Sequence, residues 1–100
     1  MYYRIDKFAV PAHSRTKFLE RVETTNVFLR NQDGYVRDHI LEQEAPHGSN
    51  IITIMEWQNS DVVKRVSADV KAMYAEVGFD PHTFMQQLGV VGEFGMYEPV

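Results

Sequence analysis

Apolar residues recur at every second position in some segments, as in strands, and at every third or fourth position in others, as in helices. One strand-like segment differs from the others. Asn50–Trp57 is dense in β-branched residues and ends in the only tryptophan. Both of its alternating faces are largely apolar: Ile51, Thr53, Met55 and Trp57 on one, and Ile52, Ile54 and Glu56 on the other. A strand that is apolar on both faces is covered on both faces, so this pattern predicts an inner strand.

Three further strands and three helices are predicted around this block. The strands are Tyr2–Val10, Tyr35–Gln43 and Val90–Glu98, and the helices are Arg15–Arg30, Asp61–Val77 and the short Pro81–Leu88. Residues 44–49 have loop composition and connect two strands. Helix starts are marked by Ser14, by Asn59 or Ser60, and by Asp80; helix ends are marked by Gly34, Gly78 and Gly89. The predicted buried stripes are Phe18, Leu19, Val22, Asn26 and Leu29 on the first helix, and Val63, Val66, Val70, Met73 and Val77 on the second.

The order of elements, βαββα(α)β, predicts an α+β fold of ferredoxin-like type with a four-stranded antiparallel sheet. Two βαβ units place both long helices on one side of the sheet. The other sheet face then exposes large apolar side chains, which is rare on soluble monomers. We therefore expect one domain, residues 1–100, that forms a homodimer through the open sheet face.

Two charged residues interrupt the first strand. Arg4 and Asp6 share a face with Tyr2, Phe8 and Val10. Either a bulge re-aims the strand, or both side chains point into a polar pocket. A carboxylate desolvated in such a pocket would have a raised pKa and suit proton abstraction; the alternative is a plain ion pair near the strand end.

The composition restricts the classes of function. A net charge of -4 with ten scattered Lys and Arg residues argues against nucleic-acid binding, and the absence of cysteine excludes thiol chemistry and disulfides. The four histidines lack ligand spacing, so no metal is expected. The serines and glycines form no nucleophile elbow or phosphate loop, and no cofactor site is predicted. The charged N-terminus and the short apolar runs lead us to expect a cytoplasmic protein that does not enter a membrane.

Two segments resemble the antibiotic-biosynthesis-monooxygenase-like family. One runs from Phe8-Ala9-Val10-Pro11 through Thr16–Val22 to Asp33-Gly34-Tyr35, and the other is Ile52–Ser60. The resemblance covers roughly Tyr3 to Tyr97. It implies a dimeric α+β barrel, and members include cofactor-independent monooxygenases of aromatic phenols and haem-degrading enzymes. The haem-degrading branch does not fit, since Asp6 stands where those members have asparagine, and the second helix has neither His nor Trp.

The resemblance and the residues together predict a cofactor-independent monooxygenase of a small aromatic or quinol-type substrate. Its catalytic residues would be Asp6, His39 and Tyr74, with Asp6 or His39 as the base and Tyr74 as a hydrogen-bond donor. Its substrate-binding residues would be Arg4, Met55, Trp57, Met73 and Phe84. His39 could instead form a hydrogen bond across the dimer interface, and the apolar residues could be ordinary core. The alternative function is a non-enzymatic dimeric module that binds a small apolar molecule or no ligand.

Overall fold

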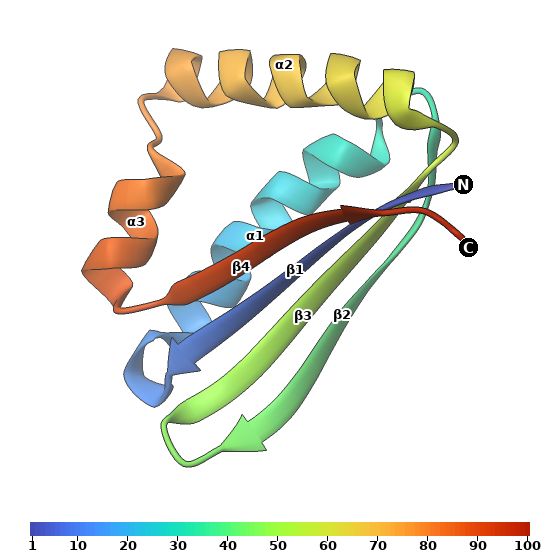
Figure 1. Cartoon of the computed structure of the whole chain (residues 1–100). Coiled ribbons are helices and arrows are strands. Elements are labelled where there is room, and N and C mark those ends of the chain that lie inside the picture. Colours follow the sequence, from blue (N-terminus) through green and yellow to red (C-terminus); the bar gives the residue numbers. More distant parts are fainter.

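The computed structural model describes all 100 residues, Met1–Val100, as a four-stranded antiparallel sheet with its helices on one side (Figure 1). The elements are β1 (Tyr2–Pro11), α1 (Arg15–Arg30), β2 (Tyr35–Ala45), β3 (Gly48–Trp57), α2 (Ser60–Val77), α3 (Pro81–Leu88) and β4 (Val91–Tyr97), with a 3-10 turn at Ala12–Ser14. The strand order is β2-β3-β1-β4. The predicted α+β fold and order of elements are confirmed.

Strand β3 is an inner strand, as its two apolar faces predict. It pairs with β2 on one side and β1 on the other, and β1 also pairs with β4. The β1–β3 register is continuous from Tyr2 to Pro11, with Asp6 opposite Thr53, so no bulge re-aims β1. On the other side of β1, Asp6 lies opposite Phe94. Even-numbered positions of β1 and odd-numbered positions of β3 therefore face the helices together.

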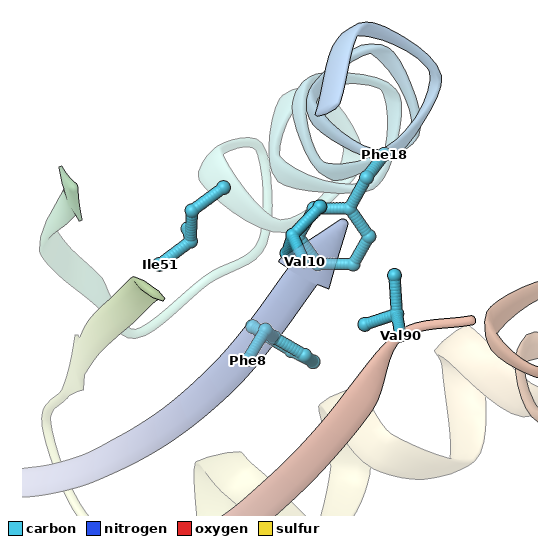
Figure 2. Packing of buried hydrophobic residues seen from close by; sticks show 5 residues of the cluster. All are labelled: Phe8, Val10, Phe18, Ile51 and Val90. Carbon is cyan, nitrogen blue, oxygen red and sulfur yellow. The ribbon is translucent and has the colours of Figure 1, made fainter. Parts of the chain in front are cut away.

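The apolar interior consists of two separate clusters rather than one. Figure 2 shows the first, made of Phe8, Val10, Phe18, Ile51 and Val90. The second consists of Met55, Trp57, Val62 and Val66. Helix α1 links the two, because Phe18 belongs to the first cluster while Leu29 packs against the second.

Helix ends follow the predicted signals with one correction. Asn59 accepts a hydrogen bond from the Val62 amide at 3.0 Å, and Asp80 accepts one from the His82 amide at 3.1 Å. Ser14 stands at the N-cap position of α1, but its hydroxyl makes no capping bond; it donates instead to the Leu88 carbonyl at 2.6 Å. Ser14 therefore ties the start of α1 to the end of α3.

Two local predictions were wrong. Residues 44–49 do join two antiparallel strands as expected of a β-hairpin, but the connection is shorter than predicted, because β2 continues to Ala45 and pairs there with Gly48. Val77 was predicted to face inward, yet it is 62% exposed. Helix α2 leaves the end of β3 and extends beyond the sheet, so its last turn has no sheet beneath it (Figure 1).

Gly34 and Gly78 allow a controlled test of this packing. Both have positive φ, 93° and 69°. A Cβ at Gly34 would lie 2.5 Å from Val62 Cγ1, whereas a Cβ at Gly78 would meet nothing within 4 Å. We expect Gly78→Ala to cost about 1 kcal/mol of backbone strain, and Gly34→Ala about 2–4 kcal/mol, because overpacking adds to the strain. Urea unfolding measures both free energies; equal costs would show that the contact between Gly34 and α2 is not tight.

Candidate functional site

A pocket of about 810 Å³ lies between the sheet and the three helices. Residues of β1, β3, β4, α1, α2 and α3 line it, and 15 of the 26 lining residues are hydrophobic. A partly enclosed, mainly apolar cavity of this size with a few polar groups is typical of small-molecule sites. It occupies the space between the two apolar clusters.

The polar pair of β1 points into this pocket. Arg4 Nε donates to Asp6 Oδ1 at 2.6 Å, and the Arg4 guanidinium lies 5.4 Å from the Phe94 ring centroid. The Asp6 side chain is 16% exposed. Burial raises the pKa of Asp6 above its ordinary value, although the hydrogen bond and charge of Arg4 act in the opposite direction. Asp6 is thus a carboxylate for which taking up a proton is made easier by its surroundings.

The apolar wall includes three predicted substrate-binding residues. Met55, Trp57 and Phe84 all line the pocket. Trp57 is 3% exposed and packs edge-on against Tyr35, with ring centroids 6.1 Å apart. The indole therefore serves both the core and the pocket wall.

Tyr74 reaches the pocket from α2. Its hydroxyl lies 3.1 Å from Thr25 Oγ1, and its ring packs 5.0 Å from that of Phe79, centroid to centroid. Thr25 and Phe79 also line the pocket. The Tyr74–Thr25 hydrogen bond connects α2 to α1 across the space between them, with either hydroxyl as the donor.

Two predicted site residues lie away from the pocket. His39 pairs with Ile54 of β3, which is an even-numbered position, so strand alternation puts it on the sheet face opposite the helices. Met73 is on α2, but the lining side of that helix passes through Val70 and Tyr74 and leaves Met73 out. Within one chain, His39 and Met73 therefore do not share the pocket with Asp6, contrary to the prediction.

Sequence reasoning missed two polar lining residues of α1. Arg21 is not part of the predicted buried stripe, yet its guanidinium carbon lies 3.4 Å from the Phe79 ring centroid and it lines the pocket. Asn26 was assigned to the buried stripe, which is correct at 5% exposure, but its place in the pocket wall was not foreseen. A polar amide within an apolar helical stripe was the available signal.

Two other structural features bear on ligand classes. No three His, Asp or Glu side chains come together in an arrangement that could hold a metal ion. None of the helices combines the length and apolarity that a membrane crossing requires.

Comparisons with known proteins identify structural relatives. No protein-family model matches the sequence, and no curated protein sequence matches it significantly. Among solved structures, an asparagine-to-alanine variant of SnoaB, a cofactor-independent oxygenase from Streptomyces nogalater, has a TM-score of 0.72 at 24% identity, covering 98% of this chain and 91% of its own. A candidate antibiotic biosynthesis monooxygenase from Deinococcus radiodurans has a TM-score of 0.70 at 16% identity, covering 100% and 93%. A candidate monooxygenase from Shewanella loihica has a TM-score of 0.68 at 20% identity, covering 99% and 93%.

These similarities extend over nearly the whole length of each chain. They confirm the resemblance stated from the sequence at the level of the fold. At such low identity, the chemistry of this chain has to be argued from its own residues.

The raised pKa of Asp6 predicts how the stability of an Asp6 variant changes with pH. Because its folded pKa is raised, its stabilising contribution is present below the ordinary value of 3.8 and is lost as pH rises through the folded pKa. We expect Asp6→Asn to be more stable than the wild type at pH 7, and the gain to vanish below pH 3.8.

Asp38 has the opposite sign and supplies the control. The hydrogen bonds from Arg30, at 2.9 Å to each carboxylate oxygen, lower the pKa of Asp38 below 3.8. Asp38→Asn should cost about 1–3 kcal/mol at pH 7, and the cost should disappear as pH falls through the folded pKa. Urea unfolding from pH 3 to pH 8 measures both variants; matching pH profiles for the two would contradict the assignment for Asp6.

Proposed function

We propose that this chain belongs to the antibiotic-biosynthesis-monooxygenase-like family and is a cofactor-independent monooxygenase of a small aromatic or quinol-type substrate. The observation that carries the proposal is Asp6, a desolvated carboxylate with a raised pKa in the wall of a mainly apolar pocket of about 810 Å³. The fold shared with SnoaB, itself a cofactor-independent oxygenase, supports the same conclusion.

In this mechanism Asp6 removes a proton from an acidic phenol or from the activated methylene of an anthrone. The resulting carbanion or enolate passes one electron to O₂, and the two radicals combine to a peroxide that loses water. A methylene, or in a phenol the ring C–H ortho or para to the phenolate oxygen, thereby becomes a carbonyl: the substrate loses four electrons, and O₂ gains four, with one oxygen in the product and one in water. No external reductant is needed, so the protein has to supply only a base, orientation and a dry cavity.

The remaining lining residues take supporting roles. Trp57 and Met55 provide apolar surface for the ring, and Phe84 lines the α3 side. Tyr74 has two possible roles. Its hydroxyl donates a hydrogen bond to a substrate oxygen once the bond with Thr25 is broken, or it keeps the bond with Thr25 and the tyrosine ring positions the substrate. Arg4 stabilises the ionised form of Asp6 between turnovers. Proton removal is assigned to Asp6 rather than His39, because only Asp6 lines the pocket.

Oxygen consumption with anthrone-like phenols and hydroquinones tests the proposal. We expect Asp6→Ala to lower the rate above the protein-free blank by about 10²–10⁴-fold, the usual contribution of a general base. Tyr74→Phe should lower it by less, since it removes a single hydrogen bond. With anthrone, one O₂ should be consumed for each carbonyl formed.

Two variants serve as controls in this assay. Asp69→Asn removes an exposed carboxylate of α2 outside the pocket and should leave the rate unchanged. His39→Ala removes the other predicted base. It should also leave the rate of oxygen consumption unchanged, because proton removal is assigned to Asp6. Equal rates for wild type and Asp6→Ala would reject Asp6 as the base. No catalysed oxygen uptake with any substrate would favour the non-enzymatic binding module.

We also propose a homodimer formed through the sheet face opposite the helices. That face carries the apolar side chains of Tyr3, Ile5, Leu41, Ile52, Ile54, Val91 and Tyr97, as the strand registers place them. Leu41 and Tyr97 are about half exposed, at 50% and 51%. Such a face suits a standard interface of about 800 Å² per partner. His39 would then lie within the interface.

Light scattering at micromolar concentration should give twice the chain mass of 11.6 kDa. Ile54→Lys, near the centre of the face, should yield the monomer, because an unpaired ammonium would be buried there. Exposed Lys64→Glu on α2 is the control and should stay dimeric. A monomeric wild type would refute the interface.

A further inference from the structure

Two hydrogen-bond donors of α1 have no partner in the protein. Arg21 Nε and Asn26 Nδ2 are the only buried side-chain nitrogen or oxygen atoms in the chain without a hydrogen-bond partner. Both residues line the pocket. Buried polar groups are nearly always hydrogen-bonded, and an unpaired one is costly. Two exceptions in one pocket wall point to a partner outside the chain.

Arg21 also lacks a balancing charge. Its guanidinium lies against Phe79 at 3.4 Å and 5.4 Å from the Tyr74 ring centroid, and it takes part in none of the five ion pairs of the protein. The carboxylate of Asp80, which follows Phe79 in the chain, accepts from Thr83 Oγ1 at 2.8 Å and caps α3. The aromatic rings fix the position of the cation without neutralising it.

Asn26 lies at the point where the apolar core divides. Along α1, Phe18 and Val22 pack on the first cluster and Leu29 packs on the second, with Asn26 between them. Asn26 lines the same pocket as Asp6 and Thr53, which lie opposite each other in the β1–β3 register. An apolar residue at this point could have joined the two clusters.

The charges around the pocket also favour an anion. Arg4, Arg21 and Lys71 line it together with only two carboxylates, those of Asp6 and Asp80. The chain as a whole has a net charge of -4. A local excess of positive charge in an acidic protein attracts a negatively charged ligand.

We propose that Arg21 and Asn26 form a two-point subsite for an aromatic anion. Arg21 pairs with a carboxylate or an ionised phenolic oxygen at one end of the ring system, and Asn26 Nδ2 donates to a second oxygen. The two residues are five positions apart on α1, a rise of about 7.5 Å along the axis. The Arg21 guanidinium extends to Phe79, so the two donors address different ends of a fused ring system. As a statement about the substrate, this inference rests on the proposed oxygenase function; as a statement about binding, it stands alone.

Calorimetric titration with three non-oxidised probes tests the subsite. The probes are a hydroxynaphthoate with its oxygen groups on opposite rings, its neutral carboxamide, and the naphthoate without the hydroxyl. We expect the wild type to bind the hydroxynaphthoate at least 10-fold more tightly than the carboxamide. Equal affinities would overturn the proposal.

Substitutions at Arg21 separate recognition from a structural role. Arg21→Met should reduce the preference for the anion to within twofold, while affinity for the carboxamide changes less than threefold. Arg21→Lys keeps the charge and should keep most of the preference. Lys17→Met, the same loss of charge on the exposed side of α1, should change nothing. Equal weakening of both probes by Arg21→Met would show that Arg21 only braces α1 against Phe79.

Asn26→Leu tests the hydrogen bond from Asn26 to the second oxygen of the ligand. It removes the unpaired amide, so we expect the melting temperature of the empty protein to rise by about 4 °C or more. Affinity for the hydroxynaphthoate should fall three- to tenfold, with no loss for the naphthoate that lacks the hydroxyl. An equal loss for both naphthoates would overturn the role of Asn26.

Binding and oxygen uptake then distinguish the two proposals. Tight binding of the anion without catalysed oxygen uptake from any phenol would leave the subsite standing and reject the oxygenase function. The opposite result is catalysed oxygen uptake with neutral hydroquinones but equal binding of the anionic and neutral probes. That result would support the oxygenase function and reject the anion subsite.

Discussion

The structure depends on an interior that is divided rather than filled. The Phe8–Val10–Ile51 cluster holds one end of α1 to the sheet, and the Met55–Trp57 cluster holds the other end together with the start of α2. A pocket of about 810 Å³ separates them. Because interiors normally pack to the density of organic crystals, an open space of this size costs stability, and its retention favours a ligand-binding role.

The same division explains why polar residues can occupy inward positions. Asp6 and Asn26 point toward the interior, where an apolar residue would be expected in a continuous core. Opposite walls have different characters: the sheet side carries a carboxylate with a raised pKa, and the α1 side carries donors without partners. A ligand with an acidic hydrogen and an oxygen anion would complement both walls.

Helix α2 closes the pocket with few contacts of its own. Val62 and Val66 are buried against Trp57, whereas the last turn at Val77 is exposed. The Tyr74–Thr25 hydrogen bond and the contacts of the Arg21 guanidinium with the Tyr74 and Phe79 rings join this far end to α1. Helix α2 is therefore packed on the sheet through its first turns and held to α1 through these side-chain contacts near its end.

The sequence alone is enough to predict the order of elements, most of their bounds and the inner position of β3. These depend on local periodicity and capping, which short segments express on their own. The sequence leaves open whether Arg4 and Asp6 face a pocket, and the continuous β1–β3 register answers that question. The packing of the elements places His39 and Met73 outside the pocket, lets Ser14 donate to the Leu88 carbonyl and stacks Arg21 on Phe79. Each of these depends on the relative placement of elements distant in sequence, or on the phase of a long helix that leaves the sheet. Asn50–Trp57 remains the strand around which the chain is organised, and the fold decided that one of its faces borders a cavity.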